Sequence, residues 1–177
     1  SAVGQLNQPR LPDIEGRDEF EGPAFHSARW DTSLDLTGKR VAVIGTGASA
    51  MQLVPEVAAQ ASEVLVFQRT PPWIYPAAHY RTDVPEGEHW LINHVPYYAR
   101  WYHFLLFWLD GEGLYASATK DPEWPHQERS VSESNEALRD LMIDSIKREM
   151  GEHHELVETA IPYYPPCGKR LLVDDGT

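Results

Sequence analysis

RVAVIGTGASA, residues 40–50, is the stretch that decides the fold of this chain. Residues 40–44 form a short β-branched run, which predicts a buried strand. Gly45, Gly47 and Ala50 then fit the pattern G-x-G-x-x-A. In that pattern the first glycine permits a tight turn and the second lets a pyrophosphate approach the backbone. The small third residue lets the following helix pack closely on the strand.

A strand–helix–strand unit is completed by the residues after the turn. Residues 48–60 carry apolar side chains at helical spacing, and residues 63–68 form a second apolar run. Parallel strands joined by a right-handed helical crossover make a βαβ unit, in which free N–H groups at the helix start face phosphates. The unit therefore predicts a dinucleotide-binding site. The alternative is that the glycines serve only the tight packing of the helix on the strand. The expected contacts at the turn are Gly45, Thr46, Gly47, Ala48, Ser49, Ala50 and Gln52.

The end of the second strand indicates which nucleotide is bound. An NAD site has an acidic residue there to hold the ribose 2′-hydroxyl, whereas this chain has Gln68, Arg69 and Thr70. Arginine offers a planar fork for a 2′-phosphate and threonine adds a hydroxyl donor. These residues favour NADP(H) over NAD(H), and a solvated charge at the strand end is the alternative for Arg69.

The remaining segments predict the organisation of the chain. Residues 1–38 are rich in Pro, Gly, Asp and Glu and are expected to be a connector, followed by the nucleotide-binding core over 39–86, a helical insertion over 87–160 and a return to the core over 161–177. The expected fold class is α/β, with a Rossmann-like βαβ core, an α-helical insertion and a sheet left incomplete.

Within the insertion the apolar spacing predicts one helix over residues 90–109, after a loop over residues 70–88. Ser130 and Glu133 form a capping-box pattern that opens a helix ending near Gly151. A third strand is expected at residues 171–173.

Composition excludes several classes of protein. The 177 residues carry a net charge of −12, which disfavours binding to nucleic acid or to an anionic membrane. Cys167 is the one cysteine, so no intramolecular disulfide is possible, and a reducing compartment, the cytoplasm, is expected. Adjacent His153 and His154 point apart on a helix end, so no metal site is expected.

A second motif lies ahead of the glycine turn. Residues 20–31, FEGPAFHSARWD, match F-x-G-x-x-x-H-x-x-x-W-D, whose specified positions are Phe20, Gly22, His26, Trp30 and Asp31. This motif resembles the fingerprint of Baeyer–Villiger monooxygenases, and it precedes the glycine turn as it does in that family. Residues 95–102, 121–126 and 164–170 resemble the 4-hydroxyacetophenone monooxygenase branch, and residues 4–7 with Pro9 and Pro12 are similar to the family's connector out of its flavin domain.

The resemblance implies FAD as a tight cofactor, NADPH as hydride donor and a ketone, with aryl ketones suggested by the branch, as the substrate oxidised to an ester or lactone. It implies that Thr46, Gly47, Ser49 and Gln52 meet the pyrophosphate, and that Arg69, Thr70 and Lys169 meet the 2′-phosphate. Arg170 would be the active-site arginine, whose fixed charge stabilises negative charge developing during oxygen transfer. His26 would belong to a linker between domains, with a purely structural role as the alternative.

Other functions stay open at this point. Lys169 and Arg170 could be a basic pair ending a loop, and the chain could come from an N-hydroxylating flavoprotein or be a nucleotide-binding fragment without activity. No second G-x-G-x-x-G is present, so FAD is expected in a missing domain and the isolated chain is expected to be inactive. The expected partners are that flavin domain and a second copy of the chain, the latter through the helix at residues 90–109.

Overall fold

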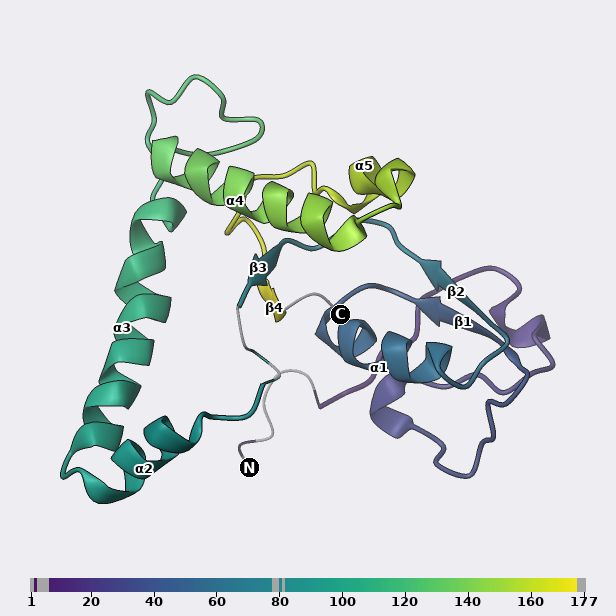
Figure 1. Ribbon diagram of the computed structural model, residues 1–177. Helices are drawn as coiled ribbons and strands as arrows, with labels where there is room; N and C mark the ends of the chain where they lie inside the picture. Colours follow the sequence, from purple (N-terminus) through teal and green to yellow (C-terminus); the bar gives the residue numbers. More distant parts are fainter. Residues whose placement is uncertain (1, 3–6, 78–79, 81, 175–177) are drawn as a thin grey trace.

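The computed structural model describes residues 2, 7–77, 80 and 82–174 (Figure 1), so residues 4–6 of the connector stretch lie outside the described residues. The strands are β1 Arg40–Ile44, β2 Glu63–Phe67, β3 Ile74–Pro76 and β4 Leu172–Asp174. The α-helices are α1 Ala48–Ala58, α2 Glu86–His94, α3 Tyr98–Ala118, α4 Glu133–Met150 and α5 Val157–Ala160, and short 3-10 helices span Arg17–Glu19, Ser27–Arg29 and His154–Leu156.

The predicted βαβ unit is confirmed. β1 and β2 pair in parallel, with Arg40 opposite Glu63 and Ile44 opposite Phe67, and α1 connects them. The side chains of Arg40 and Glu63 form an ion pair at the start of the two strands. At their other end the N–H of Gly45 donates to the carbonyl of Phe67 at 2.9 Å, which fixes the start of the glycine turn against β2.

The prediction of a continuous loop over residues 70–88 is wrong, because β3 lies within it. β3 pairs in parallel with β4, which confirms a strand near residues 171–173, and Ile74 lies opposite Leu172. A three-residue strand that ends in Pro76 carries no periodic signal, and its partner comes late in the chain. Among the described residues, β1–β2 and β3–β4 form two separate two-stranded sheets.

The single helix predicted over residues 90–109 is in fact two helices, α2 and α3. The break falls at Pro96, which disfavours the helical conformation in the residue before it, and Val95 is extended with φ −92° and ψ 119°. Tyr97 then takes a left-handed conformation with φ 64° and turns the chain into α3. α3 runs on to Ala118, past the predicted end.

The start of α4 is displaced from its prediction. The capping residue is Ser132, whose Oγ accepts a hydrogen bond from the N–H of Asn135 at 3.2 Å. Ser130 is instead buried, where its Oγ accepts from Nε1 of Trp124 at 2.8 Å. The helix ends at Gly151 as predicted, with φ 52°.

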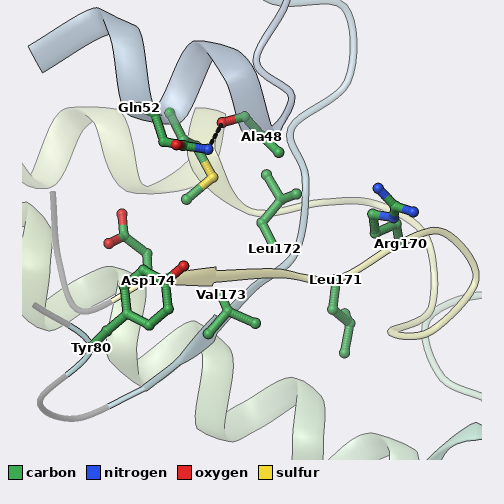
Figure 2. Close-up of a pocket in the computed structure, with 9 residues that line it drawn as sticks. Ala48, Gln52, Tyr80, Arg170, Leu171, Leu172, Val173 and Asp174 are labelled. Carbon is green, nitrogen blue, oxygen red and sulfur yellow. Dashed lines mark hydrogen bonds between the residues drawn. The ribbon is translucent and has the colours of Figure 1, made fainter. Parts of the chain in front are cut away.

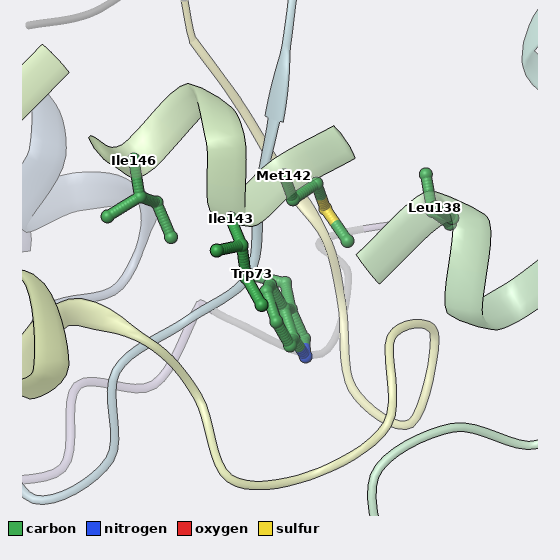
Figure 3. Packing of buried hydrophobic residues seen from close by; sticks show 5 residues of the cluster. All are labelled: Trp73, Leu138, Met142, Ile143 and Ile146. Carbon is green, nitrogen blue, oxygen red and sulfur yellow. The ribbon is translucent and has the colours of Figure 1, made fainter. Parts of the chain in front are cut away.

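The main hydrophobic core lies between β3 and α4 (Figure 3). Trp73, which precedes β3, is fully buried against one face of α4. Its indole N–H donates to the carbonyl of Tyr164 at 2.8 Å, so its polar atom is satisfied as well. The helical face against Trp73 has the three- and four-residue spacing of a core stripe and consists of Leu138, Met142, Ile143 and Ile146.

A buried amide joins three segments beside this core. Nδ2 of Asn135 donates to the carbonyls of Ser117 at 2.6 Å and Pro166 at 3.1 Å, and Oδ1 accepts from the N–H of Val131 at 3.0 Å. These bonds tie the end of α3 and the start of α4 to the segment that returns toward β4.

Candidate functional site

The glycine turn presents a helix start that is open to a ligand. Gly45 has φ +104°, a conformation that favours glycine, and a Cβ added at Gly47 would meet no atom within 4 Å. α1 has no side-chain cap, and its first backbone bond is donated by Met51. Within the described residues, the amides that precede Met51 in α1 therefore have no acceptor. Open space, unpaired amides and the positive end of a helix fit a phosphate group.

A pocket of about 180 Å³ joins this helix start to the far end of the chain (Figure 2). Ala48 and Gln52 of α1 line one side of it, and the stretch from Arg170 to Asp174 lines the other. Gln52 donates from Nε2 to the carbonyl of Ala48 at 3.0 Å, which holds its amide along the helix start. The structure thus brings Arg170 to the same pocket as α1, although the pocket is smaller than the roughly 300–1,000 Å³ of a complete small-molecule site.

The end of β2 is attached to the returning segment by side-chain hydrogen bonds. Gln68 donates to the carbonyl of Thr159 at 3.2 Å, and the hydroxyls of Thr70 and Tyr163 lie 3.3 Å apart. The hydroxyl of Tyr164 donates to the carbonyl of Pro71 at 3.3 Å. The predicted residues at the end of β2 therefore lie beside the loop that carries Lys169.

Lys169 and Arg69 are both exposed, but their surroundings differ. The ammonium of Lys169 lies 4.4 Å from the ring centroid of Tyr164, a cation–π contact. Burial raises the pKa of the Tyr164 hydroxyl, so that ring stays neutral across the physiological range. No hydrogen bond or ion pair from the described residues reaches the guanidinium of Arg69. Arg69 is thus available to an anion, whereas Lys169 would first leave its aromatic neighbour.

The fingerprint residues form a local structure of their own. A Cβ at Gly22 would come within 2.6 Å of the Phe20 ring, so the ring lies over the glycine. Nδ1 of His26 accepts from the N–H of Ala28 at 3.1 Å and caps a 3-10 turn. The rings of Phe25 and Trp30 meet edge to face at 5.3 Å.

Asp31 closes the fingerprint. Its carboxylate accepts from the backbone N–H and the hydroxyl of Ser33 at 2.9 and 2.6 Å, and these bonds lower the pKa of Asp31. None of the five fingerprint residues lines the pocket that holds Arg170.

Sequence reasoning missed residues that shape the site. Tyr163 faces Thr70, and Asp174 is buried and lines the pocket together with Tyr80. The sequence signal for Tyr163 and Asp174 is their place near the resemblance at residues 164–170, and Tyr80 has no such signal. Asp174 also lies in β4, whose pairing with β3 the sequence did not reveal.

Membrane-spanning helices and metal clusters are both absent from the described part of the chain. No helix there is long and apolar enough to cross a membrane. No cluster of three or more His, Cys, Asp or Glu side chains there could hold a metal ion.

A βαβ unit with an open glycine turn defines a dinucleotide-binding class of protein, and comparisons with known proteins narrow that class. Residues 2–84 match the family described as flavin-binding monooxygenase-like. An uncharacterized monooxygenase of Sinorhizobium fredii, y4iD, is 40% identical over 176 residues, which cover 99% of this chain and 27% of that protein. A Baeyer–Villiger monooxygenase of Streptomyces coelicolor is 55% identical over 76 residues, 43% of this chain and 15% of that protein.

A solved structure agrees with these relatives. The crystal structure of OTEMO in complex with FAD and NADP matches with a TM-score of 0.67 and 28% identity, over 98% of this chain and 37% of that one. The α/β fold with a Rossmann-type core is therefore confirmed, and the chain is related to flavin-binding monooxygenases whose members include Baeyer–Villiger enzymes. The match to y4iD covers 99% of this chain, and the chain therefore spans about a quarter of the length of that relative.

Proposed function

We propose that this chain is the NADP(H)-binding part of a FAD-dependent Baeyer–Villiger monooxygenase that oxidises ketones, aryl ketones among them, to esters or lactones. The observation that carries the proposal is the pocket shared by the start of α1 and Arg170. It places a phosphate-binding helix end beside a fixed positive charge that comes from the opposite end of the sequence. The named relatives and the FAD- and NADP-bound neighbour support the same assignment.

The turn residues hold the pyrophosphate in this proposal. The unpaired amides at Ala48 and Ser49 donate to phosphate oxygens, and Thr46 and Gln52 flank them. Gly47 leaves room for the phosphates, because no described residue lies within 4 Å of a Cβ added there. When bound, NADPH supplies a hydride and FAD supplies the chemistry of oxygen activation.

The 2′-phosphate is held where the end of β2 meets the returning loop. Arg69 provides the planar fork and Thr70 a hydroxyl, and Lys169 adds charge when it leaves Tyr164. A chain with a net charge of −12 needs such a local basic group to bind a phosphate. Arg170, on the pocket side, stabilises negative charge that develops during oxygen transfer.

Calorimetry with NADPH and NADH tests the nucleotide assignment. We expect tighter binding of NADPH, because a hydrogen bond to a charged group contributes about 1.5–3 kcal/mol, or roughly 10- to 150-fold. Arg69→Ala should reduce that preference, while Lys147→Ala, an exposed basic residue on α4, should leave it unchanged. Equal affinity of the unmodified chain for both nucleotides would remove the assignment of Gln68, Arg69 and Thr70.

Two measurements test whether flavin binding and ketone oxidation require a flavin domain in addition to this chain. The 177-residue chain should purify without a flavin absorption band and should not oxidise ketones, because it has no G-x-G-x-x-G motif for FAD. In the full-length parent, Arg170→Ala should keep NADPH binding but slow ester formation by about 10²–10³, with reducing equivalents lost as hydrogen peroxide. Near-normal ester formation would show that Arg170 does not take part in oxygen transfer.

A further inference from the structure

α3 is an apolar helix with most of its surface uncovered. It meets α2 at one end and α4 at the other, and in Figure 1 its long middle stands apart from α1, β1 and β2. The exposed fractions of Trp101, Phe104 and Trp108 are 68%, 51% and 50%. Aromatic side chains exposed in one contiguous row are typical of an interaction surface.

The exposed aromatic residues of α3 share one face of the helix. Together with Gly111, successive members are separated alternately by three and four residues, the spacing that keeps side chains on one face of a helix against a partner helix. The rings of Trp101 and Phe104 lie 6.0 Å apart and those of Phe104 and Trp108 lie 6.1 Å apart, so the row is continuous. We call it the aromatic seam, and it consists of Trp101, Phe104, Trp108, Gly111 and Tyr115.

The seam lies away from the side of α3 that the chain itself covers. A hydrogen bond to Glu88 of α2 raises the pKa of the Tyr102 hydroxyl, so Tyr102 faces α2. Ser117 is buried and donates to the carbonyl of Ser134 at 3.2 Å, and Leu114 packs against the core beside α4. These contacts hold α3 by its ends and its other faces and leave the seam open.

The spacing of the seam from Trp101 to Gly111 is the same when it is read from either end. Its intervals of three, four and three residues are symmetric about residue 106. In an antiparallel pair of α3 helices, Trp101 therefore faces Gly111 and Phe104 faces Trp108. Among the described residues, nothing lies within 4 Å of a Cβ added at Gly111, so this glycine leaves room for a partner side chain.

We propose that two copies of this chain associate through the aromatic seam, as an antiparallel α3 pair about a two-fold axis in which Trp101 of each copy fills the space over Gly111 of the other. A two-fold axis closes the assembly, because both partners use the same surface.

Side-chain size favours the antiparallel pair over a parallel one. In a parallel pair Trp101 would oppose Trp101 and Gly111 would oppose Gly111, so large and small residues would not complement each other. In the antiparallel pair the basic end of each helix, at Arg100 and His103, lies along the acidic end of the other, at Glu112. In this arrangement the two helix dipoles run in opposite directions, which is favourable because unlike ends lie side by side.

The buried area is sufficient for association. Phe107, 73% exposed, flanks the seam near the axis, as does Leu105 on the other side. The five exposed aromatic side chains on this side of α3 and Leu105, each losing roughly 100 Å², remove about 600 Å² per copy. The total of about 1,200 Å² lies at the lower end of the range of stable interfaces, roughly 1,200–2,000 Å².

A size exchange tests the pairing. Gly111→Leu should stabilise α3 as a helix but weaken the dimer at least tenfold, measured by sedimentation of the 177-residue chain, because leucine occupies the space that Trp101 needs. Gly113→Leu, on the side of the same helix opposite the seam, is the matched control and should leave dimerisation unchanged. The double variant Trp101→Ala, Gly111→Trp should restore the dimer, since it exchanges the large and the small residue.

Cross-linking tests the direction. Leu105→Cys should be joined to its own copy by a short bismaleimide, whereas Tyr115→Cys should not, because about 18 residues of helix would separate the two substituted positions by roughly 27 Å. The natural Cys167 gives little background, since burial raises the pKa of its thiol. Efficient joining of both variants would show a parallel pair, and a monomer at all concentrations would show that another partner covers the seam; either result overturns the proposal.

Discussion

The βαβ unit and the β3–α4 region differ in how their residues are buried. β1 and β2 contain no fully buried residue, and α1 buries only Val57. α4 buries six residues, and Trp73 before β3 is completely enclosed. The glycine turn is therefore shaped by local sequence, whereas the stability of the chain depends on the second region. The pocket with Arg170 forms where the two meet.

Removing the centre of the core should have the largest effect. Trp73→Ala should lower the free energy of unfolding by about 3–5 kcal/mol, because it leaves a cavity against α4 and an unpaired carbonyl at Tyr164. Phe67→Ala in the exposed β2 should lower it by less than about 1 kcal/mol. Urea unfolding followed by circular dichroism measures both, and similar losses would contradict the comparison.

Loss of the buried amide should be the next largest effect. Asn135→Ala leaves two carbonyls and an N–H without partners in the protein interior, at about 1–3 kcal/mol. Asn93→Ala is the control, because Asn93 bonds only within α2 and is exposed. Thermal unfolding of the two variants should separate them clearly; an Asn135 variant as stable as the Asn93 variant would show that the three segments hold together without it.

The two glycines of the turn should separate stability from binding. Gly45→Ala forces φ +104° on a residue with a side chain, and should destabilise the chain by about 1–3 kcal/mol. Gly47→Ala should change stability by less than about 0.5 kcal/mol, since its Cβ would meet no atom of the described residues within 4 Å. The same Cβ should weaken NADPH binding, measured by calorimetry. Unchanged affinity of the Gly47 variant for NADPH would show that the pyrophosphate does not bind at this turn.

The smallest expected effect concerns Cys167, which packs beside the α4 core. Burial raises the pKa of its thiol, so alkylation by iodoacetamide should reach half its maximal rate at a higher pH in the folded chain than in urea. A raised folded pKa stabilises the fold below the unfolded pKa, and that contribution is lost as the pH rises through the folded value. Cys167→Ala should remove this loss of stability at alkaline pH. Equal alkylation profiles in both states would show that the thiol is open to water.

Local patterns predicted the elements whose signals lie within a few residues. The strands β1 and β2 and the helix α1 were found because apolar runs and a glycine turn follow one another over residues 40–67. The predicted α2–α3 helix ignored the effect of Pro96 on Val95. Ser132 was missed as the cap because the capping-box pattern begins at Ser130, whereas the residue three after Ser132 is Asn135; burial beside Trp124 takes Ser130 away from the helix start.

Non-local features could not be predicted from periodicity. The pairing of β3 with β4 joins segments nearly a hundred residues apart, and neither three-residue strand has a pattern of its own. Arg170 was named through the resemblance alone, and its approach to Gln52 depends on that pairing. The contact of Lys169 with Tyr164 is equally invisible in sequence, because it depends on how a proline-rich loop turns.

The pairing of β3 with β4 also sets an order of events during synthesis. β1, α1 and β2 leave the ribosome together, so the glycine turn can form as soon as residue 67 has emerged. Arg170 and β4 follow roughly 100 residues later, about 5–20 s at the usual rates of translation. During that interval the glycine turn of the nascent chain is already formed. Trp73 and the apolar face of α4 stay uncovered until the segment that leads to β4 has been made. A chaperone that binds exposed aromatic segments would therefore find its target between the emergence of β3 and that of β4.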